Sequence, residues 1–328
     1  MAHMATVLVT RQTQGDSLEQ LQQLHQVEVW AEDRPIPRQT LLQKVATVQG
    51  LYVSHLDKID QELLDAAPHL KVISTYGVGI EHIDVAACTE RGIAVGHTPH
   101  VVSEATADLA MAILLALSRR IPEAQQFVRE DRWNVWSPHT LVGTDVFGKT
   151  MGFLGLGRIG QAIARRAKGF GMPLLYHTRT PNPQAEQELG ARHCSWPDLL
   201  TQSDVLMVIA PLTPQTYQMV NAEALAMMKP TTLLVNVARG GLVDTEALVQ
   251  ALSNGTLAGA ALDVTDPEPI GAEHPLLHLS NCLVVPHIGT ATLETRSAIT
   301  QMAVENLLLG LEGKPLRHPA NPEVRPRT

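Results

Sequence analysis

The chain has 328 residues, of which 45% are hydrophobic and 18% charged, a composition and length that favour about two globular domains. Its net charge of −8, without a basic patch, argues against nucleic acid or an anionic membrane surface as a partner. The apolar runs are too short to cross a bilayer, and the three cysteines lie far apart, so we expect a cytoplasmic protein with no disulfide framework and no metal site.

The N-terminal third alternates short apolar strands with helical segments. Strands are expected at 6–10, 27–30, 50–54, 71–75 and 93–97, with helical patterns around 58–66 and 81–91. This alternation is typical of βαβ units in a parallel sheet. A long helix, apolar on most faces, is expected over 105–121.

The remaining chain repeats the alternation. Strands are expected at 151–155, 172–176, 204–210, 232–236, 258–264 and 282–286, with helices at 158–168 and 292–312. The fold class is therefore α/β, with two Rossmann-like, doubly wound parallel-sheet domains and an active-site cleft between them. We expect an NAD(P)-binding Rossmann domain over 104–291. A flavodoxin-like substrate-binding domain would comprise 5–103 plus 292–328, because we expect the last helix to return to the first domain.

A glycine-rich turn follows the strand at 151–155 and opens the helix at 158–168. Gly155 allows the tight turn, Gly157 lets the backbone approach a pyrophosphate, and Gly160 permits close packing of helix on strand. The helix N-terminus adds unbonded N–H groups and the positive end of the helix dipole. In this strand–turn–helix context the pattern predicts dinucleotide binding.

The next strand indicates which dinucleotide binds. NAD sites usually place an acidic residue there to accept from the ribose 2′-OH, but residues 176–180 (YHTRT) contain no carboxylate. Arg179 can pair with a 2′-phosphate, and Thr178 or Thr180 can hydrogen-bond to it. We therefore expect NADP(H) as the preferred cofactor, with NAD(H) possible. The alternative is that Arg179 is a solvated loop arginine.

Polar residues follow three later strands, at the strand ends where ligands bind in open α/β sheets. Arg239 can hold the carboxylate of a 2-oxo acid and polarise its carbonyl. His287 can deliver the proton that hydride transfer to the carbonyl requires, and Glu268 can orient its ring. Asp263 is a candidate anchor for the nicotinamide carboxamide, and Gly289 leaves room for the backbone near the cofactor. For each of these residues considered alone, the alternative is an ordinary surface or turn residue without a functional role.

The loop at 76–80 (YGVGI) follows a strand of the first domain. Its backbone N–H groups can bind a small carboxylate. The alternative is a simple turn.

These motifs together resemble the D-isomer-specific 2-hydroxyacid dehydrogenase family from end to end. The motifs that carry the resemblance are YGVGIEHID, GLGRIGQAIARR, NVARGGLVD, LDVTDPEP and PHIGTAT, in that order. Within the family the chain is most similar to the glyoxylate reductase/hydroxypyruvate reductase branch.

The resemblance implies a set of site residues. The catalytic set is Arg239, Glu268 and His287. The substrate set is Val78, Gly79, Arg239, Thr290 and Trp136, the last reaching the active site of a partner subunit. The cofactor set is Thr106, Gly155, Gly157, Arg158, Ile159, Gly160, Arg179, Thr180, Pro211, Thr216, Val237, Asp263, His287 and Gly289.

The expected activity is NADPH-dependent reduction of glyoxylate and hydroxypyruvate to glycolate and D-glycerate, with a histidine as general acid. The expected partners are a small 2-oxo or 2-hydroxy acid and a second copy of the chain, forming a homodimer through the nucleotide-binding domain. A bulkier 2-oxo acid, or phosphite oxidation, is an alternative within the same fold. A dinucleotide-sensing corepressor is the non-enzymatic alternative, because fold alone does not fix function.

Overall fold

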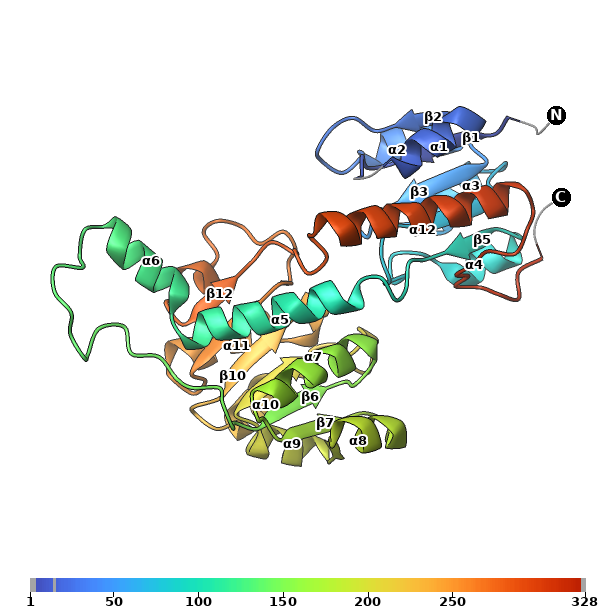
Figure 1. Cartoon of the computed structure of the whole chain (residues 1–328). Coiled ribbons are helices and arrows are strands. Elements are labelled where there is room, and N and C mark those ends of the chain that lie inside the picture. The colour runs from blue at the N-terminus through green and yellow to red at the C-terminus, as the bar shows by residue number, and fades with distance from the viewer. Residues whose placement is uncertain (1–3, 14–15, 326–328) are drawn as a thin grey trace. The chain divides into compact units, whose positions relative to one another are not determined.

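The computed structural model describes residues 4–13 and 16–325, and these form two compact units (Figure 1). Unit 1 contains the described residues up to Val102 and those from Thr290 onward. Unit 2 is Ser103–Gly289. Each unit has its own parallel sheet.

The sheet of unit 1 has five parallel strands in the order β2-β1-β3-β4-β5, the order typical of flavodoxin-like domains. The strands are β1 (Thr6–Val9), β2 (Gln26–Val29), β3 (Gly50–Val53), β4 (Val72–Thr75) and β5 (Ala94–Gly96). Each occupies the place that its apolar run predicts. The short length and full burial of β3, β4 and β5 suit strands that are covered on both faces.

Helices cover both faces of this sheet because alternate strand residues point to opposite sides. The helices are α1 (Ser17–Leu24), α2 (Arg38–Val45), α3 (Gln61–Ala66), α4 (Val85–Glu90) and α12 (Leu293–Leu311). Leu8 and Leu51 pack in one apolar cluster with side chains of α2, α3 and α4. Val7 and Tyr52 pack in a second cluster with side chains of α1 and α12.

The sheet of unit 2 has seven parallel strands in the order β12-β11-β10-β9-β6-β7-β8. The strands are β6 (Met151–Leu154), β7 (Leu174–His177), β8 (Arg192–His193), β9 (Val205–Val208), β10 (Leu233–Asn236), β11 (Gly259–Leu262) and β12 (Cys282–Val284). The direction of winding reverses between β6 and β9, which makes their carboxyl ends a topological switch point. The predicted fold class of two parallel α/β sheets is confirmed.

The helices of unit 2, except the second of them, pack on the two faces of its sheet. They are α5 (Ser103–Ser118), α6 (Ile121–Arg129), α7 (Arg158–Gly169), α8 (Pro183–Leu189), α9 (Trp196–Gln202), α10 (Ala222–Met227) and α11 (Thr245–Ser253), with short 3-10 turns at Gly240–Leu242 and Pro275–His278. The single helix expected over 105–121 is wrong at its end. Arg120 adopts a left-handed conformation with φ 52°, so α5 stops at Ser118 and α6 starts anew.

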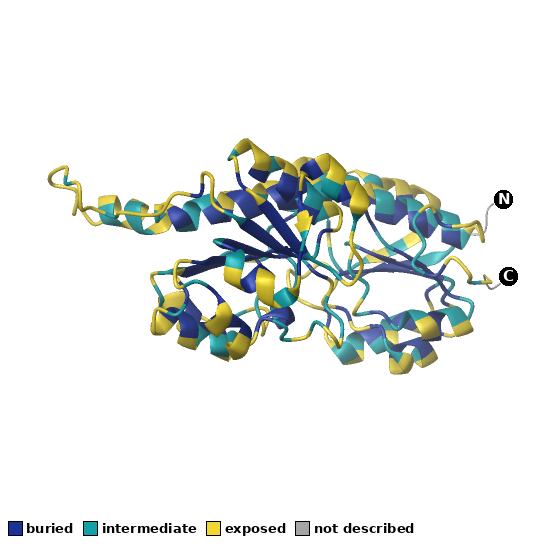
Figure 2. Ribbon diagram, turned by 90° about the horizontal axis from the view of Figure 1, so that it is seen from below, coloured by how far each residue is buried: buried dark blue, intermediate teal, exposed yellow. Residues whose placement is uncertain are grey.

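Residues 121–142, which we call the arm, extend from the body of unit 2 (Figure 1). α6 contains no buried residue, and the arm is coloured mostly as exposed in Figure 2. Six of its large apolar side chains are more than half exposed: Ile121, Val128, Trp133, Val135, Trp136 and Val142. No helix in the described ranges combines the length and apolar character needed to span a bilayer.

Candidate active site

The carboxyl ends of β10, β11 and β12 bring polar residues to one edge of the unit 2 sheet. Arg239 follows β10, Asp263 follows β11 and His287 follows β12. Because these strands are adjacent and parallel, their carboxyl ends lie at the same edge. The sequence placed these residues at strand ends, and the sheet order makes the three ends neighbours.

His287 pairs with Glu268, which lies in the segment between β11 and β12. The Nδ1 atom of His287 is 2.6 Å from Oε1 of Glu268, and both side chains are about one-third exposed. The backbone N–H of Thr265 reaches toward the other carboxylate oxygen at 3.4 Å, and the Thr265 hydroxyl donates to the carbonyl of Pro267 at 2.8 Å. The turn that carries Glu268 is therefore held by its own residues, and Glu268 in turn fixes the imidazole.

Asp263 is buried and holds the turn that carries His287. One carboxylate oxygen accepts from the N–H of Ile288 at 2.6 Å, and the other accepts from the N–H of Gly289 at 2.9 Å. The backbone N–H of His287 donates to the Asp263 carbonyl at 2.9 Å. Burial raises the pKa of Asp263, against the opposing effect of the hydrogen bond from Ile288.

Position 289 leaves little room for a side chain larger than that of glycine. A Cβ on Gly289 would lie 3.0 Å from a carboxylate oxygen of Asp263 and 3.4 Å from Thr106 of α5. Thr106 itself is buried. Side chains of the protein therefore pack closely against Gly289 on one side, and its place near the cofactor stays a prediction.

The segment that carries Arg239 is held by an amide that sequence analysis did not single out. Asn236, fully buried at the end of β10, donates from Nδ2 to the carbonyl of Arg239 at 2.9 Å and accepts from the N–H of Ala238 at 3.0 Å. A Cβ on Gly240 would lie 2.0 Å from the carbonyl oxygen of Thr265, so the Arg239 segment and the Glu268 segment touch through backbone. An asparagine closing a buried strand was the available signal, since such a residue must find partners for its amide.

The glycine-rich turn after β6 fits a dinucleotide pyrophosphate. Gly155 has φ +94°, and a Cβ there would meet the backbone of Ala210 at 2.9 Å. A Cβ on Gly157 would meet no described atom within 4 Å, so this part of the chain leaves the backbone uncovered at that point. Within the described residues, the N–H groups of Arg158, Ile159 and Gly160 donate no hydrogen bond.

The N-terminus of α7 differs from those of the helices that follow it in unit 2. Side chains of Asn182, Ser195, Asn221 and Asp244 cap α8, α9, α10 and α11. By contrast, Gly157 provides no side-chain cap to α7, and the first turn of α7 has no acidic residue. The positive end of this helix is therefore left for an external anion.

The remaining predicted cofactor residues also belong to unit 2. Thr216 donates from its hydroxyl to the carbonyl of Pro211 at 2.7 Å, in the loop after β9. Val237 is buried immediately after β10. Arg179 and Thr180 are exposed in the turn after β7, and Arg179 makes no ion pair or side-chain hydrogen bond within the described ranges.

The predicted carboxylate loop belongs to unit 1, as does Thr290. Among the described residues, the N–H groups of Val78, Gly79 and Ile80 donate no hydrogen bond. The loop is fixed by the N–H of Thr98, which donates to the Gly77 carbonyl at 2.9 Å, and by Nδ1 of His97, 3.1 Å from the Val78 carbonyl. His97 therefore contacts the loop that the sequence predicts to bind the substrate carboxylate.

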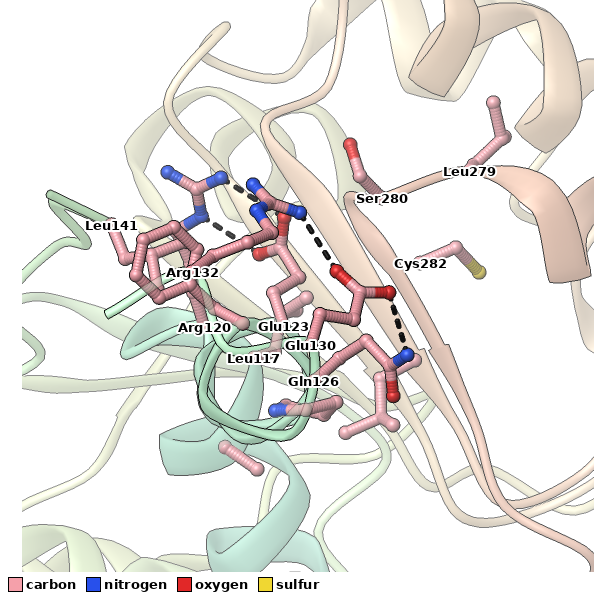
Figure 3. Close-up of a pocket in the computed structure, with 14 residues that line it drawn as sticks. Leu117, Arg120, Glu123, Gln126, Glu130, Arg132, Leu141, Leu279, Ser280 and Cys282 are labelled. Carbon is pink, nitrogen blue, oxygen red and sulfur yellow. Dashed lines mark hydrogen bonds and ion pairs between the residues drawn. The ribbon is translucent and has the colours of Figure 1, made fainter. Parts of the chain in front are cut away.

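A cavity of about 430 Å³ lies apart from these residues, at the base of the arm (Figure 3). It is lined by α5, α6, the arm and residues 279–283. Its charged side chains pair with one another: Arg120 with Glu123, and Arg132 with Glu130 (Figure 3). Trp136, predicted to touch substrate, is 78% exposed on the arm.

Known proteins resemble this chain along almost its whole length. Residues 111–289 match the family model for the D-isomer specific 2-hydroxyacid dehydrogenase, NAD binding domain. A glyoxylate reductase of Thermococcus onnurineus is 46% identical over 312 residues, covering 94% of this chain and 93% of that protein. A protein of known structure from Thermus thermophilus is 47% identical, with a TM-score of 0.92 and coverage of 96% of this chain and 99% of that one.

A further solved structure has bound ligands. It is an NADPH-dependent glyoxylate/hydroxypyruvate reductase from Sinorhizobium meliloti in complex with NADP and malonate, 35% identical, with a TM-score of 0.87 and coverage of 99% of this chain and 100% of that one. The family match, the sequence identities and the paired Glu268 and His287 agree. The chain belongs to the D-isomer specific 2-hydroxyacid dehydrogenases, in the glyoxylate reductase branch, and is an NAD(P)-dependent oxidoreductase acting on CH–OH groups.

Proposed function

We propose that this protein reduces glyoxylate and hydroxypyruvate to glycolate and D-glycerate, with NADPH as the preferred reductant. The observation that carries the proposal is the 2.6 Å pair between His287 and Glu268 at the carboxyl edge of the sheet. The names of the relatives from Thermococcus and Sinorhizobium support the two substrates.

NADPH, when bound, supplies the hydride that adds to the carbonyl carbon of the 2-oxo acid. The Arg239 guanidinium binds the substrate carboxylate and polarises the neighbouring carbonyl. Because Nδ1 of His287 faces Glu268, the proton delivered to the carbonyl oxygen leaves from Nε2. Glu268 stabilises the imidazolium before the transfer and keeps the ring oriented afterwards.

Each unit has its own proposed binding residues. Unit 2 binds the dinucleotide along Gly155–Gly160, with Asp263 near the nicotinamide carboxamide. Unit 1 supplies the N–H groups of Val78 and Gly79 for the substrate carboxylate. The pyrophosphate and carboxylate assignments are supported by backbone donors that have no acceptor within the described ranges.

The preference for NADPH is supported by the turn after β7. Its residues include the exposed Arg179 and no carboxylate that would repel a 2′-phosphate. Initial rates with glyoxylate, hydroxypyruvate and pyruvate, each with NADPH and NADH, test substrate and cofactor together. We expect the first two substrates with NADPH to turn over best.

The variant Arg179→Ala separates cofactor choice from catalysis. We expect its KM for NADPH to rise about ten- to hundredfold, the loss of one charge-assisted contact, with the KM for NADH unchanged. A wild-type preference for NADH would refute the cofactor assignment. Turnover only of larger 2-oxo acids would refute the substrate assignment.

We also propose that the chain forms a homodimer through unit 2. The arm exposes six large apolar side chains, and an exposed apolar surface of this kind usually marks a contact with another protein chain. A cavity of about 430 Å³ lies at the base of the arm. Trp136 would reach the active site of the partner subunit. Sedimentation equilibrium of the wild type and of Trp133→Glu tests this, with a dimer expected for the first and dissociation for the second. A wild-type monomer at micromolar concentration would exclude the dimer.

A further inference from the structure

The turn that carries Arg179 is pinned at both ends by aromatic side chains beneath it. At its start, Nε2 of His193 lies 3.0 Å from the carbonyl of Thr178. At its end, the backbone N–H of Asn182 donates to the hydroxyl of Tyr176 at 2.7 Å. Within it, the Thr178 hydroxyl donates to the carbonyl of Thr180 at 2.8 Å. Arg179 therefore projects from a backbone segment that is fixed on either side.

The partner of His193 defines its tautomer. A carbonyl oxygen only accepts, so Nε2 of His193 must carry a hydrogen. His177 makes the reverse contact, because its Nδ1 lies 3.0 Å from the carbonyl of Cys194, the residue after His193. The two imidazole rings lie nearly parallel, with centroids 6.2 Å apart. Each histidine thus holds the backbone next to the other.

The packing around His193 leaves it little freedom to choose another partner. Its ring makes an edge-on contact with the fully buried ring of Tyr176, with centroids 5.0 Å apart. The Tyr176 hydroxyl is itself held, since it donates to Glu186 at 2.8 Å. A donor that is oriented before ligand binding contributes more to recognition than one that must be ordered at that moment.

We propose that His193 is a positioning residue for recognition of the 2′-phosphate of the cofactor, acting through the Thr178 carbonyl on the turn that presents Arg179 and Thr180. This inference rests on the proposed preference for NADPH. β8, which contributes His193, is a two-residue edge strand that sequence analysis did not predict. Its short length is sufficient to place one imidazole under the turn.

Substitutions can test this role because the contact with the Thr178 carbonyl involves one particular nitrogen of His193, Nε2. The amide nitrogen of glutamine can take the place of imidazole Nε2, whereas that of asparagine is short by one bond and corresponds to Nδ1. We therefore compare His193→Gln, His193→Asn and His193→Leu. Arg192→Gln is the matched control, because Arg192 lies on the same strand, carries a full charge and donates to Gln202 at 2.7 Å instead of to the turn.

Isothermal titration calorimetry with 2′,5′-ADP and with 5′-AMP measures the contribution of the 2′-phosphate to binding affinity, and it does not require turnover. For His193→Leu and His193→Asn we expect the Kd for 2′,5′-ADP to rise about three- to tenfold, the loss of one hydrogen bond, with the Kd for 5′-AMP unchanged. His193→Gln and Arg192→Gln should bind both ligands as the wild type does. In steady state, the KM for NADPH should rise in the first two variants, with kcat and the KM for NADH unaffected.

Failure of this inference differs from failure of the proposed cofactor preference. If Arg179→Ala loses discrimination between the two ligands but His193→Leu keeps it, the role of His193 is refuted and the cofactor preference stands. Equal weakening of both ligands in His193→Leu would also refute it, since that result indicates general damage to the fold. If the wild type does not discriminate between the ligands, the cofactor preference fails and the role of His193 fails with it.

Discussion

In unit 2, the carboxyl ends of β10, β11 and β12 carry polar side chains that bond to one another and to nearby backbone. The carboxyl ends of β6 and β7, by contrast, present donors that have no acceptor among the residues that the structure describes. Asp263, Glu268 and His287 are linked by contacts of 2.6 to 2.9 Å. Within the described ranges, the N–H groups at the start of α7 and the side chain of Arg179 have no such partner.

The difference follows from the role proposed for each group of strand ends, which is proton donation for one and cofactor binding for the other. A proton donor is effective only if its ring is oriented before the substrate arrives, so its partners belong to the protein. A pyrophosphate needs several N–H donors at once, and any protein acceptor placed there would compete with it. We call the carboxyl ends of β10, β11 and β12 the closed half of this sheet edge, because their polar groups bond within the protein. We call the carboxyl ends of β6 and β7 the open half, because their donors are left for a ligand. Changes in the closed half should lower kcat, and changes in the open half should raise the Kd of the cofactor.

The largest effect should come from His287→Ala in the closed half. Removing the proton donor should lower kcat about 10²- to 10⁴-fold, the usual contribution of general acid catalysis, with the Kd of NADP⁺ nearly unchanged. Stopped-flow rates and a calorimetric titration measure the two quantities. His278→Ala is the control, because His278 is exposed and lies in the same unit. If kcat stays within a fewfold of the wild-type value, His287 is not the general acid.

Much of the closed half could be predicted from the sequence because it depends on residue types at strand ends. Apolar runs located β10, β11 and β12, and a histidine after a proline at the end of one run predicted a proton donor. The pairing with Glu268 followed from chemistry, since a general acid needs an orienting carboxylate. The hydrogen bonds of Asp263 did not follow, because the acceptors of the N–H groups of Ile288 and Gly289 depend on the path of the turn.

Other features were missed for equally physical reasons. β8 consists of Arg192 and His193, a polar pair too short for periodicity to register. The break between α5 and α6 was missed because the apolar pattern continues through it, and only the left-handed conformation of Arg120 ends the first helix. The role of Asn236 depends on the Arg239 carbonyl turning back toward it, which spacing alone does not indicate.

A smaller effect in the closed half should follow from Glu268→Gln. Glutamine keeps an oxygen that can accept from Nδ1 of His287 but removes the charge that favours the imidazolium, so kcat should fall about ten- to hundredfold, the value of one charge-assisted hydrogen bond. A rate equal to that of the wild type would mean that the charge of Glu268 does not contribute to catalysis. Glu273→Gln, an exposed neutralisation in the same segment, controls for net charge.

In the open half, Gly157→Leu should weaken cofactor binding without harming the fold. A Cβ at this position meets no described atom within 4 Å, so the melting temperature should stay close to that of the wild type. It would, however, occupy the approach of the pyrophosphate, and the Kd of NADP⁺ and of NAD⁺ should rise about tenfold or more, since about 1.4 kcal/mol of lost contact suffices. Gly169→Leu, where a Cβ also meets nothing within 4 Å, is the matched control at the other end of α7. Equal cofactor affinity in both variants would place the pyrophosphate elsewhere.

The smallest effect should come from Arg158→Gln, which tests whether the start of α7 has a favourable partner within the protein. Arg158 is the first residue of α7 and puts a positive charge at the positive end of the helix dipole, an arrangement that costs stability when no anion is bound. Without cofactor, the variant should therefore melt about 1 to 4 °C higher than the wild type, from about 0.3 to 1 kcal/mol of relieved repulsion. With cofactor, the same change should raise the Kd of NADP⁺ and NAD⁺ alike by about two- to fivefold, as expected for one exposed ion pair. Differential scanning calorimetry with and without NADP⁺ measures both signs in one experiment. A variant that is less stable without cofactor would show that Arg158 already has a favourable protein partner, and the start of α7 would then belong with the closed half of the sheet.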